Sequence, residues 1–227
     1  MTAHRIGCIV PAFNAAPTIT SVVGRLRVSM PASTIIVVDD GSTDGTEDLV
    51  RGLADATVRF ARNRGKGAAL RAGFALALAE GHDTLVTVDA DGQHDPRFAP
   101  QLVAALHAAD LAIGARTRTP GEMPLGRRIT NRLSAAAVAR CIGQPVADAQ
   151  SGFRALRSDM ARDVRPRGDR YEFETEFLLV AGRRGYRISF VPVPTSYPGT
   201  VPSRFRSVRD SARIVETIWR FSRGAEA

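Results

Sequence analysis

The chain of 227 residues has two cysteines, a single lysine and no long apolar run. Cys8 and Cys141 are too few for a disulfide framework or a cysteine-based metal site. The longest apolar runs, such as residues 102–106, are far shorter than the roughly 20 residues that a membrane-spanning helix needs. The first residues lack the pattern of a secretory signal. We therefore expect a cytoplasmic protein with no spanning helix.

The charge of the chain is strongly one-sided. The formal net charge is +8, and because Lys66 is the only lysine, nearly all of the positive charge is arginine. Such an excess predicts attraction to anionic partners, which include phosphates, nucleic acid and an acidic membrane surface. The hydrophobic fraction of 44% is ordinary for a globular protein, and this length allows one domain with a real core.

Strand-like runs alternate with segments of helical periodicity. This alternation predicts an α/β fold, a mostly parallel sheet with helices on both faces. We expect one domain with a main body over residues 1–200 and a basic amphipathic segment over 201–227. Residues 149–156 are expected to hold a turn at Ser151-Gly152-Phe153-Arg154. Strands are predicted at 6–10, 34–38, 57–60, 84–88, 111–113 and 187–191, and helices at 15–29, 45–54, 67–80, 96–108, 123–142, 172–182 and 206–221.

Four polar segments directly follow predicted strands. They are residues 11–14, 39–42, 63–67 and 89–93. Ligands of open parallel sheets bind beyond the carboxyl ends of the strands. Because those ends share one edge of the sheet, we expect the four segments to converge on one binding site.

Two acids follow the fourth predicted strand. Asp89 and Asp91 are one residue apart, and a turn beginning at Asp89 can aim both carboxylates at one point. Mg²⁺ and Mn²⁺ favour oxygen ligands and often share them with substrate phosphates. Gln93 can add a carbonyl ligand. The plainer interpretation is a turn that caps the helix beginning at Pro96, but Asp95 alone would serve as that cap.

The second and third polar segments suit a nucleotide. Asp39 and Asp40 can accept hydrogen bonds from a base or a ribose, although a turn followed by a helix cap also explains them. Gly65 lets the backbone approach a ligand closely beside Lys66, or it simply starts a helix with a solvated lysine. The spacings of a P-loop and of a dinucleotide fingerprint are both absent.

Arginines gather in the second half of the chain. Arginine forks suit phosphate oxygens, whereas the plainer interpretation is a solvated face. In the C-terminal segment we expect Val208, Val215, Ile218 and Trp219 to share one helical face, which either packs on the core or lies in a membrane interface. The arginines of the first group are Arg116, Arg118, Arg127, Arg128, Arg132 and Arg140, with Arg154 following the turn at Ser151-Gly152-Phe153.

Taken in order, these segments resemble glycosyltransferase family 2, and in particular its dolichyl- or polyprenyl-phosphate mannosyl and glucosyl synthase branch. The resemblance runs from about Ile6 to Phe221. It rests on Ile9-Val10-Pro11-Ala12-Phe13-Asn14, Val37-Val38-Asp39-Asp40-Gly41-Ser42, Asn63-Arg64-Gly65-Lys66-Gly67, Asp89-Ala90-Asp91-Gly92-Gln93-His94, Gly114-Ala115-Arg116, Ser151-Gly152-Phe153-Arg154 and Glu172-Phe173-Glu174-Thr175-Glu176.

This resemblance implies a GT-A fold and an inverting transfer of one hexose to a polyprenyl phosphate at the cytoplasmic leaflet. The donor would be of the GDP-mannose or UDP-glucose type, with Mg²⁺ or Mn²⁺ held by Asp89, Asp91 and Gln93. Arg116, Arg132 and Arg154 would hold the acceptor phosphate and, with the two aspartates, form the catalytic set. Donor contacts would come from Pro11, Phe13, Asn14, Asp39, Asp40, Gly65, Lys66, Asp89, Ala90 and Asp91.

Some features depart from the family pattern. Ala15 stands where glutamate is common, the membrane helices that some relatives append are absent, and so is the Gln-x-x-Arg-Trp signature of processive synthases. Membrane contact would therefore be peripheral and transfer would stop at one sugar. Three alternatives remain. One is a hydroxyl acceptor with Glu172 or Glu174 as general base. Another is a catalytically silent scaffold. The third is an arginine-rich nucleic-acid binder, which the carboxylates at the strand ends disfavour.

Overall fold

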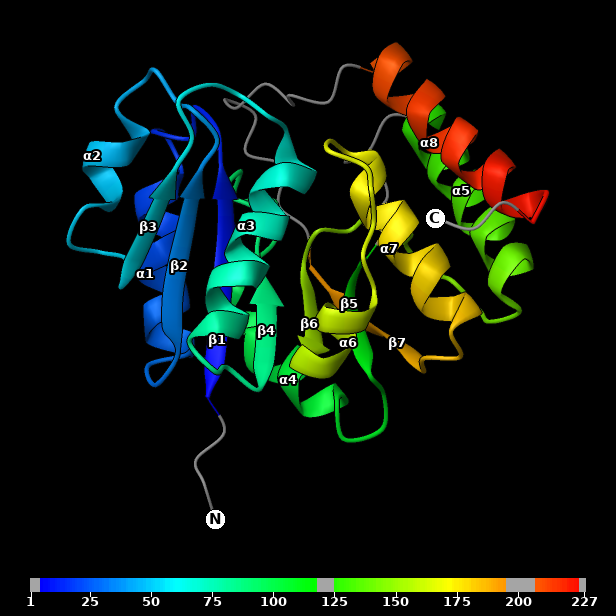
Figure 1. Cartoon of the computed structure of the whole chain (residues 1–227), viewed down its shortest axis with the longest axis horizontal. Coiled ribbons are helices and arrows are strands. Elements are labelled where there is room, and N and C mark those ends of the chain that lie inside the picture. The colour runs from blue at the N-terminus through cyan, green and yellow to red at the C-terminus, as the bar shows by residue number, and fades with distance from the viewer. Residues whose placement is uncertain (1–4, 118–124, 195–206, 225–227) are drawn as a thin grey trace.

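The computed structural model describes residues 5–117, 125–194 and 207–224, with side chains from 131 onward in the second range and from 209 onward in the third. Seven strands form one sheet in the order β3-β2-β1-β4-β6-β5-β7 (Figure 1). The strands are β1 (Ile6–Ala12), β2 (Thr34–Asp39), β3 (Ala56–Arg59), β4 (Thr84–Thr87), β5 (Leu111–Arg116), β6 (Arg154–Arg157) and β7 (Ile188–Val193). The helices are α1 (Ile19–Ser29), α2 (Thr46–Val50), α3 (Lys66–Ala79), η1 (Pro96–Phe98), α4 (Ala99–Ala105), α5 (Leu125–Ile142), α6 (Ser158–Asp163), α7 (Glu172–Arg183) and α8 (Ser207–Ser222).

The sheet is parallel except at β6. Strands β3, β2, β1 and β4 pair in parallel, as do β5 and β7. Strand β6 runs antiparallel to both of its neighbours, β4 and β5. The predicted mostly parallel sheet is confirmed, but strand β6, which begins at Arg154 at the end of the predicted turn, was not predicted. Helix α6 was not predicted either.

Helices cover both faces of the sheet because successive strand residues point to opposite sides. In β1, Ile9 belongs to the core shared with α3 and α7, whereas Cys8 and Val10 belong to the core shared with α1 and α4. The contact between α3 and the sheet is close at Gly73, where an added Cβ would lie 2.4 Å from Ile9 Cγ2. The sheet is therefore buried on both faces, as a parallel sheet requires.

The last helix, α8, packs against α7 and α5 (Figure 1). Its inner face carries Ile214, Ile218 and Phe221, of which Phe221 is 2% exposed. Val215 and Trp219 point outward and are 63% and 53% exposed. The predicted shared face holds for Val215 and Trp219 but not for Ile218, which packs against the core, and the side chain of Val208 lies outside the described residues. Within the described ranges, no helix is long and apolar enough to cross a bilayer.

Candidate active site

The loops that follow the parallel strands meet at one edge of the sheet. Asp40 N donates to Ala12 O at 2.8 Å, which joins the end of β2 to the end of β1. Phe60 N donates to Asp39 O at 2.9 Å, which joins the end of β3 to β2. Thr18 Oγ1 donates to Ala90 O at 2.6 Å and so joins the loop after β1 to the loop after β4. The four predicted polar segments are therefore brought together.

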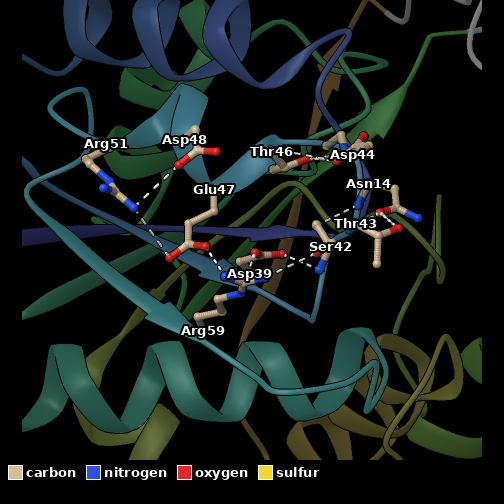
Figure 2. A network of polar contacts seen from close by, with 11 residues as sticks. Asn14, Asp39, Ser42, Thr43, Asp44, Thr46, Glu47, Asp48, Arg51 and Arg59 are labelled. Atoms are coloured by element: carbon tan, nitrogen blue, oxygen red, sulfur yellow. Dashed lines mark hydrogen bonds and ion pairs between the residues drawn. The ribbon is translucent and has the colours of Figure 1, made fainter.

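The loops after β1 and β2 are fastened to each other at Asn14 (Figure 2). Asn14 N donates to Ser42 Oγ at 2.8 Å, and Asn14 Oδ1 accepts from Thr43 N at 2.7 Å. Asn14 has a φ of +48°, a left-handed conformation that asparagine tolerates better than most residues. Asp44 adds a third link by accepting from Ala16 N at 3.0 Å. These bonds fix the loop that carries the partly buried Phe13.

Within the described part of the chain, one carboxylate oxygen of Asp39 accepts a hydrogen bond, and the other does not. Its Oδ1 accepts from Ser42 N at 2.9 Å. Its Oδ2 is buried, has no hydrogen-bond donor among the described residues, and lies 3.7 Å from Arg59 Nε (Figure 2). A buried acceptor without a donor is costly. A ligand N–H or O–H that reached this oxygen would remove that cost.

Asp40 serves the neighbouring loop. Its carboxylate accepts from Asn63 Nδ2 at 2.8 Å, Arg64 N at 2.6 Å and Gly65 N at 2.8 Å. These three bonds fix the segment that leads into α3. Asp40 therefore positions Gly65 and Lys66.

Lys66 lies between two acids. Its Nζ is 2.5 Å from Asp89 Oδ1 and 2.5 Å from Glu174 Oε1. The three side chains are 16%, 19% and 3% exposed, respectively. Burial alone would lower the pKa of Lys66, but the charges of Asp89 and Glu174 outweigh it and hold that pKa well above its ordinary value. Burial likewise opposes ionisation of Asp89, and the Lys66 charge outweighs it and lowers the pKa of Asp89.

Gly152 covers this ion pair. A Cβ at Gly152 would lie 2.5 Å from Lys66 Nζ and 2.5 Å from Asp89 Oδ2. Thr87 Oγ1 donates to Gly152 O at 2.6 Å and fixes the glycine over the end of β4. A side chain at residue 152 would force one of these two charged groups to shift.

Asp91 has a different environment from Asp89. Its Oδ1 accepts from Gln93 N at 2.9 Å. Burial, together with the nearby charge of Asp89, raises the pKa of Asp91 to about 6. Within the described residues, no group of three or more His, Cys, Asp or Glu side chains could hold a metal alone. Two crowded carboxylates still fit a divalent ion that takes its other ligands from Gln93, water and a substrate phosphate.

Arg116 and the loop before β6 form the other side of the site. Arg116 donates to Asp148 through Nε at 2.6 Å and through Nη2 at 2.9 Å. His94 is buried beside this pair, with Nε2 3.5 Å from Ser151 Oγ and its ring 5.6 Å from that of Phe153. Burial lowers the pKa of His94 to about 4, so the imidazole is neutral at physiological pH. His94 thus links the loop after β4 to the loop before β6.

The other predicted arginines are dispersed. Arg154 is 4% exposed and donates to Ser151 O at 2.8 Å and to Ala149 O at 3.3 Å, so it supports the loop before β6 from inside. Arg132 and Arg140 are exposed on α5. The structure does not describe Arg118, and describes only the backbone of Arg127 and Arg128.

Sequence reasoning missed the pairing role of Glu174 and the closeness of Gly152 to Lys66. The contact of Lys66 with Glu174 joins residues 108 positions apart, so no local sequence pattern predicts it. Asp148 stands out in the sequence as an acid three residues before the Ser151 turn, but its ion pair with Arg116 was not predicted. Tyr171, whose pKa burial raises to about 12, also lies beside the site.

Comparisons with known proteins agree with this geometry. The model of the family described as "Glycosyl transferase family 2" matches residues 8–165. The undecaprenyl-phosphate mannosyltransferase of Micrococcus luteus is 34% identical over 202 residues, covering 83% of this chain and 82% of the relative. The UDP-N-acetylglucosamine–dolichyl-phosphate N-acetylglucosaminyltransferase of Methanococcus voltae is 30% identical over 83% of this chain and 84% of the relative.

A solved structure gives the same fold. Glucosyl-3-phosphoglycerate synthase from Mycobacterium tuberculosis, crystallised with Mn²⁺, uridine diphosphate and phosphoglyceric acid, superposes with a TM-score of 0.79 at 21% identity. The match covers 99% of this chain and 80% of that one. At this identity the likeness establishes the fold alone.

Proposed function

We propose, from the premise that this chain belongs to glycosyl transferase family 2, that it moves one hexose from a nucleotide-diphosphate sugar to a polyprenyl phosphate with inversion at the anomeric carbon. The observation that carries this proposal is the pair of carboxylates, Asp89 and Asp91, just after β4. Lys66 contacts Asp89, and the charge of Arg116 acts on both aspartates. The names of relatives that align over more than 80% of both chains support a polyprenyl-type acceptor.

The proposed cofactor is Mg²⁺ or Mn²⁺, held by Asp89, Asp91 and Gln93. Support comes from the raised pKa of Asp91, which reflects burial and the nearby charge of Asp89, and from the Mn²⁺ and uridine diphosphate in the structural neighbour. When bound, the ion supplies positive charge to the departing diphosphate. Lys66 adds a second positive charge there.

The proposed donor site uses the fixed loops after β1, β2 and β3. The open Oδ2 of Asp39 suits an N–H of the base or a hydroxyl of the ribose, and Phe13 offers a ring beside it. Asp40 acts by holding Gly65. The donor is of the GDP-mannose or UDP-glucose type. The remaining predicted donor contacts are Pro11, Asn14, Lys66, Asp89, Ala90 and Asp91.

We propose a phosphate acceptor because Glu174, a candidate general base for a hydroxyl acceptor, is paired with Lys66. A phosphate is already an anion and attacks without a strong base, whereas a hydroxyl needs one. Glu174 is 2% exposed and faces Lys66, which disfavours it as that base. Arg116 is the leading candidate to meet the acceptor phosphate. Arg132 remains a candidate from α5, and Arg154 supports the loop.

The lipid acceptor requires contact with a membrane, and we assign this contact to the outer face of α8 at the cytoplasmic leaflet. Trp219 and Val215 are exposed there, and Arg223 lies 4.1 Å from the centre of the Trp219 ring. Aromatic and arginine side chains together favour an interface with anionic lipid. Co-sedimentation with phosphatidylglycerol vesicles should fall strongly for Trp219→Ser, whereas equal binding by both proteins would refute the assignment.

Transfer assays test the main proposal directly. The purified protein, with Mn²⁺ or EDTA, is given GDP-mannose, UDP-glucose or UDP-N-acetylglucosamine and one of three acceptors: undecaprenyl phosphate, undecaprenol or 3-phosphoglycerate. We expect metal-dependent product only with the lipid phosphate. Asp91→Asn should abolish transfer, whereas Asp95→Asn, in the same loop, should retain it. Product on undecaprenol or on 3-phosphoglycerate in place of the lipid phosphate would contradict the proposal.

A further inference from the structure

Glu174 is brought to Lys66 by unusually close packing of two segments. Ala68 N, in the first turn of α3, donates to Asp169 O at 3.1 Å. A Cβ at Gly65 would lie 2.3 Å from Asp169 O, and one at Gly67 would lie 2.4 Å from Gly168 O. The segment that leads into α7 therefore rests directly on the start of α3. This contact fixes the first turn of α7, and with it Glu174, next to the only lysine.

Among the described residues, the Glu174 carboxylate forms its ion pair with Lys66. Its Oε1 faces Lys66 Nζ at 2.5 Å, and its Oε2 has no hydrogen-bond donor among the described residues. The charge of the buried Arg154 also acts on Glu174, but no ion pair joins the two side chains within the described ranges. Because a buried carboxylate is costly to desolvate, and Glu174 is only 2% exposed, we expect its main effect to pass through the ammonium group that it contacts.

Lys66 and a divalent ion compete for the charge of Asp89. Lys66 Nζ lies 2.5 Å from Oδ1 of Asp89, a residue that we assign to the metal. The cation and the ammonium group repel each other, so a bound ion weakens the hold of Asp89 on Lys66. Without Glu174, Asp89 would be the only acid among the described residues in contact with Lys66, and displacement would leave a buried ammonium group unpaired.

We propose that Glu174 is a positioning residue for Lys66. It retains the lysine inside the site when Asp89 turns to the divalent ion, so that the ammonium group passes from Asp89 to the donor diphosphate. This inference rests on the proposed function for the presence of a metal-bound donor. It also replaces the general-base interpretation of Glu174, because the carboxylate faces the lysine.

Mn²⁺ binding without any sugar transfer tests the inference. Free Mn²⁺ is counted by electron paramagnetic resonance during titration of the wild type, Glu174→Gln, Lys66→Met and the double variant. Glu174→Gln keeps the side-chain shape and removes the charge. In the wild-type background it should weaken Mn²⁺ binding about tenfold, within the range of coupling between contacting charges. In the Lys66→Met background its effect should fall below about threefold, because the competing ammonium group is gone.

Lys66→Met supplies a second, independent readout. In the absence of nucleotide, this variant should bind Mn²⁺ more tightly than the wild type. In the presence of Mn²⁺, it should bind uridine or guanosine diphosphate more weakly. Glu174→Asp keeps the charge and should recover part of the Mn²⁺ affinity lost in Glu174→Gln.

The matched control is Glu176→Gln. Glu176 is a buried acid on the same helix, but its Oε2 accepts from Gly168 N at 2.7 Å and its Oε1 lies 3.7 Å from Arg220 Nη2. The same charge change there should leave Mn²⁺ binding within about twofold of the wild type, because Glu176 pairs with Gly168 and Arg220 rather than with Lys66 or Asp89, and glutamine can still accept from Gly168 N. Thermal unfolding in EDTA shows whether each variant is folded.

Three outcomes would overturn the inference. An equal loss of Mn²⁺ affinity from Glu174→Gln in both backgrounds would mean that Glu174 acts without Lys66. An unchanged affinity in a wild-type background that binds Mn²⁺ would remove the role of Glu174 and leave the proposed function intact. A wild type that binds no Mn²⁺, with or without nucleotide, would overturn the metal-dependent function as well.

Discussion

Replacing Asp91 by asparagine should make the metal-free protein more stable at neutral pH. Burial and the charge of Asp89 raise the folded-state pKa of Asp91 from 3.8 to about 6. A raised acid pKa means that ionisation costs more in the folded state than in the unfolded state. The difference of about two pKa units corresponds to about 3 kcal/mol at 1.36 kcal/mol per unit. Asparagine keeps the Oδ1 that accepts from Gln93 N, so the loop keeps this hydrogen bond.

The sign of the effect sets its pH window. Below pH 3.8 Asp91 is protonated in both states, and the variant should gain nothing. As the pH rises from 3.8 through about 6, the free energy of unfolding of the wild type falls, because Asp91 ionises more readily in the unfolded state. The stability difference in favour of the variant should therefore grow over this range and level off near 3 kcal/mol above pH 7. Near pH 4.5 the advantage should be about 1 kcal/mol. Urea denaturation in EDTA at pH 4.5, 5.5, 6.5 and 7.5 measures this difference.

Asp95→Asn is the control of opposite sign. Asp95 lies in the same loop, and its hydrogen bonds to Arg97 lower its pKa. Its ionised form therefore contributes stability above the unfolded pKa, and asparagine should destabilise the protein at pH 7.5 and less so as the pH falls. A stability difference for Asp91→Asn that stays constant from pH 4.5 to 7.5 would refute the reasoning.

Two further predictions concern the Gly152 contact and the thiols. Gly152→Ala should lower kcat/KM by roughly a hundredfold, because its Cβ would displace the ion pair beneath it by about an ångström. Gly24→Ala in α1, where nothing lies within 4 Å of the new Cβ, should instead stabilise the fold by about 1 kcal/mol. Rates and denaturation curves of both variants check this pair, and a fully active Gly152→Ala would contradict it. Burial raises the pKa of Cys8 to about 11, so at pH 8 dithionitrobenzoate should titrate Cys141 alone in the folded protein and both thiols after unfolding. Two equally fast thiols would contradict that assignment.

Local patterns predicted the first half of the chain, with strands β1 to β4, well. Runs such as Ile35–Val38 are apolar on both faces, which is typical of a parallel strand between two helical layers, and turn residues follow them at once. The fold and the family resemblance are both confirmed. The convergence of the four polar segments followed from the strand-end rule, which depends on strand direction alone.

The other half depends on contacts between distant residues. Strand β6 has only four residues, two of them arginines, and it directly follows the turn at Ser151 and Gly152. Its sequence therefore carries no clear strand pattern. Its place in the sheet comes from pairing with β4 and β5 on either side. On α8, helical periodicity allows two apolar faces, and packing on α7 and α5 selects the one with Phe221. The assigned functions of the site residues stay predictions until variants are measured.

The reversed direction of β6 adds a loop from another part of the chain to the edge of the sheet where the site lies. A strand that runs against its neighbours presents its beginning where they present their ends, so the loop from Asp148 to Phe153 joins the edge formed by the outgoing loops of β1, β2, β3 and β4. The direction of the chain therefore changes at a seam between β4 and β6. Under the proposed function, substitutions beyond that seam should change the contacts to the acceptor and leave the loops that hold the nucleotide as they are.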